Sequence, residues 1–231
     1  MRHLLSSLII LLAPPLLAQS IAADAELRLQ IVSSTPGPQG HVPAVAWLEP
    51  LAGTPTLPFP PHGRYTLLQE NRMFSPHLQV IPVGSSVQFP NADPFFHNVF
   101  SLFDGRRFDL GLYEAGSSKS VTFPREGASY IFCNIHPEMS AVVLSLSTPL
   151  YAIADARDTL DLHGIPSGDY KLHLWIEGLP QPVLSSLERH LHLSSGLTNL
   201  GEIKAPIPRT TAMKHSNKFG ATYDTTPKTP Y

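Results

Sequence analysis

The stretch YIFCNIHPEM, residues 130–139, contains the only cysteine of the 231-residue chain. His136 follows Cys133 by three residues, and Met139 follows His136 by three. The apolar runs on either side, SYIF and AVVLSL, are rich in β-branched or aromatic residues and predict two strands. A turn between two strands can direct several side chains toward one centre, so this segment is a candidate metal-binding loop. The alternative for the cysteine is a buried, inert thiol.

The three side chains of this loop form a soft ligand set, which suits copper in either of its common oxidation states. Zinc sites generally contain more cysteine or histidine and seldom methionine. A trigonal copper plane needs a second histidine beside the thiolate. The best donor is His97 in NADPFFHNVFS (91–101), where aromatic residues surround it. A core histidine without a ligand role is the alternative for His97.

The pattern on both sides of this segment is that of an all-β protein. ELRLQIV (26–32), HLQVIPV (77–83) and SVQF (86–89) alternate polar and apolar residues with period 2. Short strands of this kind, bounded by turn residues, predict a sandwich or a barrel. The segment PLAGTPTLPFPPHGR (50–64) is rich in proline and predicts a connection between strands.

Three boundaries divide the chain. Residues 1–23 combine a basic start, an apolar run and small residues near Ala22 and Ala23, which is typical of a secretory signal peptide. An uncleaved N-terminal anchor is the alternative. We expect a first domain over residues 24–147, a small β module over 148–204, and a disordered polar tail over 205–231.

The composition excludes one class of partner and restricts the compartment. The chain has 16 basic and 18 acidic residues, for a net charge of −2, and no clustered basic face. A nucleic-acid partner is therefore not expected. No stretch after the signal is long and apolar enough to span a membrane. An exported chain meets an oxidising environment, in which a lone cysteine is at risk unless it is buried or bound.

The pairing of FPNADPFFHNVFS with CNIHPEM resembles the cupredoxins, the small blue copper proteins of the amicyanin and plastocyanin type. The resemblance covers roughly residues 65–147 closely and residues 26–49 loosely, and the C-x-x-H-x-x-M spacing matches the short-loop, amicyanin-like variety. It implies a Greek-key β-sandwich that holds one type 1 copper ion per chain. The metal ligands would be His97, Cys133, His136 and Met139. Asn98 would form a hydrogen bond near the cysteine sulfur and tie the two ligand segments together.

The module at 148–204 resembles carboxypeptidase-regulatory and transthyretin-like β modules. That resemblance depends on the turn and strand GIPSGDYKL, whose residues have structural roles and indicate no substrate. The expected fold class is therefore all-β, with a cupredoxin Greek-key β-sandwich followed by a small β-sandwich module.

The resemblance implies an exported, periplasmic protein that carries single electrons between redox partners and is not an enzyme. Partners would dock transiently near His136 and Pro137. A copper module for storage, delivery or sensing remains an alternative, because it would share most of the ligands. A multicopper enzyme is a further alternative, but Cys133 is flanked by Phe132 and Asn134 and lacks a His-Cys-His bridge to a second centre. A metal-free member of the fold is the last alternative.

Overall fold

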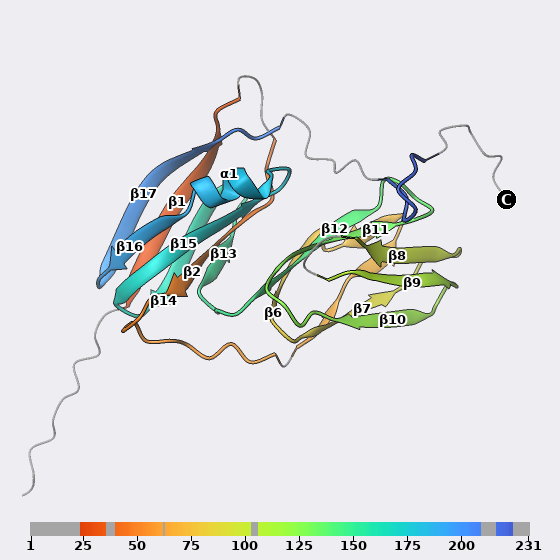
Figure 1. Ribbon diagram of the computed structural model, residues 1–231, viewed down its shortest axis with the longest axis horizontal. Helices are drawn as coiled ribbons and strands as arrows, with labels where there is room; N and C mark the ends of the chain where they lie inside the picture. Colours follow the sequence, from red (N-terminus) through yellow and green to blue (C-terminus); the bar gives the residue numbers. More distant parts are fainter. Residues whose placement is uncertain (1–23, 36–39, 62, 103–105, 209–215, 224–231) are drawn as a thin grey trace, which may run out of the picture.

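The computed structural model describes residues 24–35, 40–61, 63–102, 106–208 and 216–223, and these form two β-sandwiches (Figure 1). Apart from the short helix α1 (Gln181–Ser186), all regular elements among the described residues are strands. The prediction of an all-β fold built from two sandwiches is confirmed. The expected signal peptide, residues 1–23, lies outside the described residues. Within the described part of the chain, no helix is long and apolar enough to cross a membrane.

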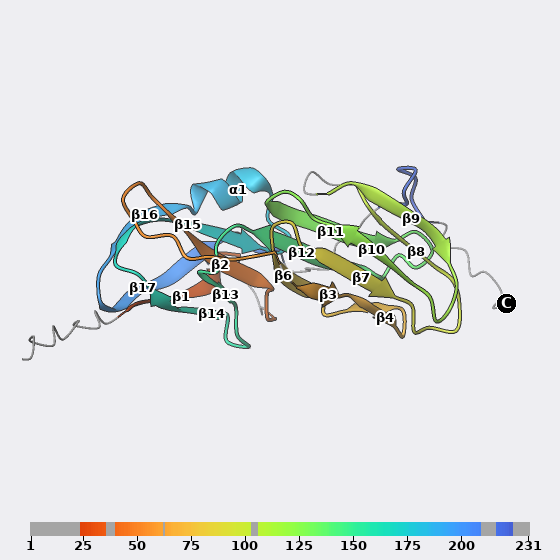
Figure 2. The ribbon, with the colours of Figure 1, turned by 90° about the horizontal axis from the view of Figure 1, so that it is seen from below.

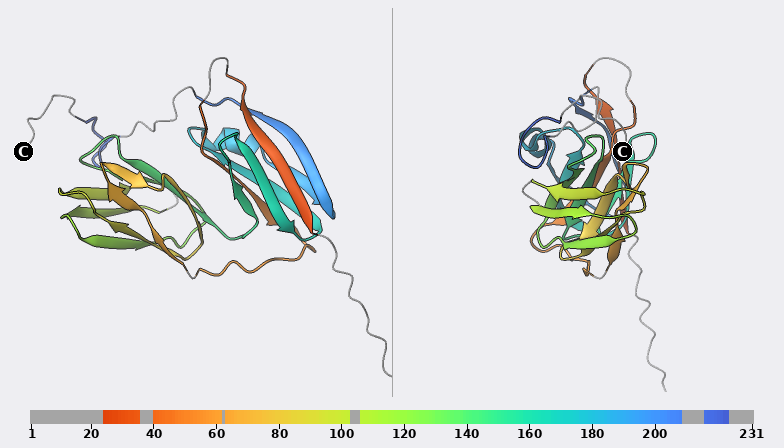
Figure 3. Two further views of the ribbon diagram at one scale, coloured as in Figure 1. Left: turned by 180° about the vertical axis from the view of Figure 1, so that it is seen from behind. Right: turned by 90° about the vertical axis from the view of Figure 1, so that its right-hand side faces the viewer.

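The terminal sandwich is formed from both ends of the described chain. One sheet has the order β14-β1-β17, and the other has the order β13-β2-β15-β16. Figure 3 shows β1 between its two neighbours, with β17 running parallel to it. The strands are β1 (Ala25–Ser33), β2 (Ala44–Pro50), β13 (Tyr151–Ile153), β14 (Thr159–Ile165), β15 (Gly168–Ile176), β16 (Arg189–Leu193) and β17 (Gly196–Ala205).

The inserted sandwich contains the candidate metal-binding loop. Its larger sheet has the order β6-β12-β11-β8-β9, its smaller sheet has the order β10-β7-β3, and the hairpin β4-β5 lies beside them. The strands are β3 (Arg64–Thr66), β4 (Leu68–Glu70), β5 (Met73–Ser75), β6 (Leu78–Pro82), β7 (Ser86–Pro90), β8 (His97–Ser101), β9 (Phe108–Tyr113), β10 (Ser118–Thr122), β11 (Gly127–Cys133) and β12 (Ser140–Leu146).

The expected domain limits need one correction at the N-terminal side. Residues 24–147 were expected to form a single domain, but β1 pairs with β14 and β17, and β2 pairs with β13 and β15. The first two strands therefore belong to the terminal sandwich, and the ligand-bearing sandwich is inserted between β2 and β13. The physical reason is that alternation within a strand reports which face is buried but does not identify the neighbouring strand.

The expected disorder of the tail over residues 205–231 is wrong for residues 205–208, because Ala205 ends β17 and Ile207 is buried in the core of the terminal sandwich. It is also wrong for residues 216–223. These residues form a turn that makes hydrogen bonds to the inserted sandwich, including one from the Lys218 amide to the side chain of Asn134. The rest of the tail beyond residue 208 lies outside the described residues.

Strand β12 joins the two sandwiches because both of its faces are buried. Ala141 and Val143 pack inside the inserted sandwich, in the same apolar cluster as Cys133 and Met139. Val142, Leu144 and Leu146 point the other way and belong to the core of the terminal sandwich. The two sandwiches consequently lie end to end in contact (Figures 1 and 2).

A polar link between His77 and Glu177 also crosses this contact. The His77 Nε2 atom lies 2.7 Å from an oxygen of Glu177, whose side chain is only 3% exposed. The other ring nitrogen of His77 donates to the carbonyl of Ser140, the residue directly after Met139. The hydrogen bond to Glu177 raises the pKa of His77 above its ordinary value, against the opposing effect of burial.

We expect His77→Gln to destabilise the protein more at pH 6 than at pH 9. A histidine with a raised pKa contributes its full stabilisation below the unfolded-state pKa of about 6.5, and the contribution is lost as the pH rises through the folded-state value. The effect should be on the order of 1 kcal/mol at pH 6, because the imidazole is partly exposed although its partner is buried. Urea denaturation at both pH values measures it.

The matched control is His163→Gln, since the His163 imidazole is exposed and lies 3.6 Å from Glu26. If His77→Gln lowers the free energy of unfolding equally at pH 6 and pH 9, the result would contradict the proposed link to Glu177.

Candidate metal centre

Two neighbouring strands bring the candidate ligands together. His97 is the first residue of β8, and Cys133 is the last residue of β11. These strands are antiparallel neighbours in which Cys133 pairs with Val99, so the histidine and the cysteine meet although 36 residues separate them. His136 and Met139 lie in the loop from β11 to β12.

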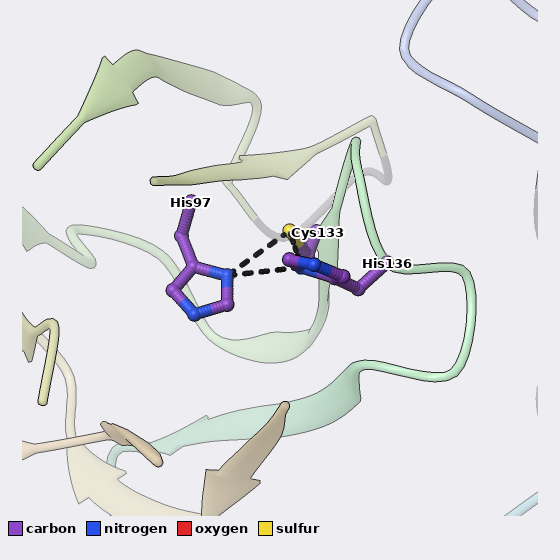
Figure 4. A group of neighbouring side chains, drawn as sticks. All are labelled: His97, Cys133 and His136. Atoms are coloured by element: carbon purple, nitrogen blue, oxygen red, sulfur yellow. Dashed lines mark hydrogen bonds between the residues drawn. The ribbon is translucent and has the colours of Figure 1, made fainter. Parts of the chain in front are cut away.

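The ligand atoms of His97, Cys133 and His136 face one another (Figure 4). The Cys133 Sγ atom lies 3.6 Å from His97 Nδ1 and 3.7 Å from His136 Nδ1, and the two Nδ1 atoms are 3.2 Å apart. For a trigonal ion with bonds of about 2.0 Å to nitrogen and about 2.3 Å to sulfur, the separations would be about 3.5 Å between nitrogens and about 3.7 Å from nitrogen to sulfur. The three atoms therefore surround a space that fits one transition-metal ion.

Met139 closes the ligand loop at its far end. Its amide donates to the carbonyl of His136, and its own carbonyl accepts a hydrogen bond from the amide of Cys133. The side chain is fully buried, in the same apolar cluster as Cys133. The thioether is thus held inside the sandwich on the ligand loop, and it is a donor of the kind that would serve copper as a weak ligand.

A buried carboxylate orients the ring of His97. The His97 Nε2 atom donates to Asp93 Oδ2 at 2.9 Å, and both side chains are buried. The Asp93 carboxylate also accepts from the amides of Asn71 and Arg72, at 2.7 and 3.0 Å. This set of bonds places the ring proton on Nε2, so the Nδ1 lone pair points toward the thiol and is available to a metal.

Asp93 is a functional residue that the sequence did not reveal. It lies four residues before His97, but its other partners come from the turn between β4 and β5, more than twenty residues upstream. Both turn residues have positive φ angles, 55° for Asn71 and 57° for Arg72, and their amides point inward to the carboxylate. Burial would raise the pKa of Asp93, but the hydrogen bonds from Arg72, His97 and Asn71 outweigh it and lower the pKa.

Burial also sets the protonation of the other ligands. It raises the pKa of the Cys133 thiol, although backbone amides of Asn98, Ile135 and His136 act in the opposite direction. It lowers the pKa of His136, and the neighbouring His97 lowers it further. At neutral pH the metal-free site therefore holds a thiol and a neutral His136, and binding a metal ion would displace the thiol proton.

Asn98 connects the two ligand segments through its backbone. Its carbonyl accepts from the amide of Asn134 at 3.0 Å, which ties β8 to the ligand loop. The side-chain nitrogen instead donates to Asp109 on β9 at 2.7 Å. The resemblance implied a link at this position, and the structure forms it with main-chain atoms while the side chain turns to Asp109.

We expect Asp93→Ala to lower the free energy of unfolding of the metal-free protein by about 3 kcal/mol. The substitution leaves three donors without their acceptor, and each unpaired buried donor costs about 1–3 kcal/mol. Because the pKa of Asp93 is lowered, its contribution is present above the ordinary value of about 3.9 and is lost as the pH falls through the folded-state value. Urea denaturation between pH 7 and pH 3 follows both effects.

Asp155→Ala is the control, because that carboxylate also accepts two backbone amides but lies on the surface of the terminal sandwich. This substitution should lower the free energy of unfolding by about 1 kcal/mol or less. A loss for Asp93→Ala no larger than that of the control would contradict the role given to Asp93.

No family model matches the chain, and no curated protein matches it. Among solved structures, a purple cupredoxin from Nitrosopumilus maritimus is 23% identical, with a TM-score of 0.33, over 36% of this chain and 99% of that one. A copper-containing nitrite reductase from Thermus scotoductus is 24% identical, with a TM-score of 0.35, over 42% of this chain and 25% of that one. A reduced amicyanin variant is 19% identical, with a TM-score of 0.35, over 37% of this chain and 84% of that one. Each of these three matches covers less than half of this chain.

Proposed function

We propose that this protein binds one copper ion through His97, Cys133 and His136, with Met139 as a weak axial ligand, and carries single electrons between redox partners. The observation that supports the proposal is the convergence of one thiol and two imidazole nitrogens at separations of 3.2 to 3.7 Å. A thiol with two imidazoles and a buried thioether on the same loop is a donor set that suits copper.

Copper, when bound, supplies a one-electron couple between its two common oxidation states. The chain contributes a fixed set of ligands that need not move when an electron arrives. His97 is held by Asp93, Cys133 ends a paired strand, and Met139 is locked inside the core. A site that keeps its geometry in both oxidation states reorganises little, which favours fast electron transfer.

The exit for electrons would be His136. Its side chain is only partly buried, and the neighbouring Ile135 is exposed on the surface, as is Phe96 beside His97. Transient redox complexes use small interfaces, and a mostly apolar rim suits short encounters. We place the docking site for partner proteins around His136 and Pro137.

We also propose that the protein is exported and is not an enzyme. Within the described residues, His97, Cys133 and His136 are the one group of three His, Cys, Asp or Glu side chains placed to hold a metal ion. A multicopper enzyme would need a second such group. Copper storage, delivery or sensing is separated from electron transfer by measuring the reduction potential and the self-exchange rate.

We expect the copper(II)-loaded protein to contain one copper per chain and to show an intense visible band from sulfur-to-copper charge transfer. Cys133→Ser should remove the band, because the thiolate is the donor of the transition. His192→Ala is the control, since that exposed imidazole pairs with Asp169 on the terminal sandwich. Absorption and EPR spectra of the loaded protein make the test, and a colourless wild-type complex would refute the type 1 site.

We expect Met139→Leu to keep one copper per chain and to raise the reduction potential. Leucine fills nearly the same volume, so the core should hold. Removing the weak axial donor withdraws electron density that favours the oxidised ion, and axial ligands tune the potential of such sites. Cyclic voltammetry of both proteins measures the change, and an unchanged potential would argue against Met139 as a ligand.

A further inference from the structure

Residues 216–223 form a folded turn although their composition is polar. The side chain of Asn217 accepts from the amides of Phe219 and Ala221, both at 3.0 Å. The Asn217 amide donates to the carbonyl of Ala221, and the amide of Gly220 donates back to Asn217. Gly220 has a φ of 81°, a conformation that glycine adopts at no steric cost. Asparagine and glycine thus supply the turn chemistry.

This turn makes direct hydrogen bonds to the ligand loop. The Lys218 amide donates to the side-chain oxygen of Asn134 at 2.8 Å. The Tyr223 hydroxyl donates to the main-chain carbonyl of Cys133 at 3.0 Å. Figure 1 shows the segment in dark blue beside the inserted sandwich, near the loop from β11 to β12. The C-terminal part of the described chain therefore contacts the cysteine ligand and the residue after it.

The same turn also reaches the strand that carries His97. The Lys218 ammonium lies 2.7 Å from Asp109 Oδ2, and Asp109 Oδ1 accepts from the side chain of Asn98. Asn98 directly follows His97 on β8. Lys218 is accordingly linked to both ligand-bearing segments, to one through Asn134 and to the other through Asp109 and Asn98.

We propose that residues 216–223 act as a strap that positions Cys133, with Tyr223 and Lys218 as the positioning residues. The ligand loop begins where the pairing of β11 ends, so the carbonyl of Cys133 is a point at which outside support restrains the loop. The hydroxyl of Tyr223 supplies this support from a side chain that is itself partly buried against the sandwich. The strap deepens the proposed copper function, on which its role in metal retention depends.

The test uses the metal-free full-length chain and the reaction of its single cysteine with iodoacetamide. Without the strap the loop should open more often, and the buried thiol should react faster. We expect Tyr223→Phe and Lys218→Pro each to raise the alkylation rate about fivefold, the factor that corresponds to one lost hydrogen bond of about 1 kcal/mol. Proline removes the backbone donor to Asn134, whereas Lys218→Ala keeps it and should have a smaller effect.

Tyr151→Phe is the matched control, since Tyr151 is a half-buried tyrosine of the terminal sandwich that stacks on Phe59. In this variant Cys133 should be alkylated at the wild-type rate. Wild-type rates for both Tyr223→Phe and Lys218→Pro would overturn the strap. Hydrogen exchange on the unmodified protein gives a second test that no folding defect can obscure, because the amides of Lys218 and Ala221 should be protected. Exchange at the rate of an unfolded peptide would also overturn it.

A copper readout separates this proposal from the previous one. If the copper-loaded wild type is blue, Tyr223→Phe should still bind one copper per chain. It should release that copper to a chelator about fivefold faster than the wild type does. If the wild type is not blue, the type 1 assignment fails, while the alkylation and exchange results still decide whether the strap positions Cys133. A blue Tyr223→Phe variant that releases copper to the chelator at the wild-type rate would overturn the strap's role in copper retention.

Discussion

The double burial of β12 is the constraint on which both sandwiches depend. Side chains alternate along a strand, so Ala141 and Val143 face one core while Val142, Leu144 and Leu146 face the other. A shift of register by one residue would exchange these two sets and disrupt both cores. Burying each valine or leucine contributes roughly 1.5–3 kcal/mol, so the register is strongly fixed. The ligand loop therefore ends at Ser140, on a strand whose register is fixed by both cores.

Support from outside the ligand loop fixes the rest of the metal centre. His97 is oriented by a carboxylate that is itself held by two amides of a hairpin turn. Phe95 packs beside both imidazoles, with its ring centroid 5.3 Å from each, and the Arg72 guanidinium lies over the Phe95 ring at 5.3 Å. This apolar environment favours the neutral thiol and the neutral imidazole. The metal-free site accordingly stays compact without two like charges facing each other.

Local chemistry in the sequence was enough to predict the strands and the spacing of the candidate ligands, because both are short-range patterns. Period-2 alternation marks buried faces, and C-x-x-H-x-x-M places three donors on one turn. Pairing partners are long-range, so the membership of β1 and β2 in the terminal sandwich could not be read from their alternation. Asp93 was missed for the same reason, since its partners at residues 71 and 72 belong to another hairpin.

The C-terminal turn was missed for a different reason. Its composition resembles that of a disordered segment, but disorder is inferred from the lack of apolar residues. A segment can be held without an apolar core when its asparagine and glycine form a turn and its polar groups find partners on a folded neighbour. Asn217 and Gly220 were the available local signal, and they indicate a turn without saying where it docks.

The insertion of one sandwich into the other imposes an order on synthesis. Every strand of the inserted sandwich lies between Arg64 and Leu146, so this unit is synthesised before β13 to β17 and before the turn at 216–223. Strand β1 is synthesised long before β17, so the pairing of these two strands can form only after β17 has been made. The turn at 216–223 is synthesised later still. During biogenesis the ligand-bearing unit therefore exists before its outer restraint. A chain that stops before residue 216 would hold the ligands without the contact to Cys133, so that contact reports that synthesis has passed the ligand-bearing unit and β17.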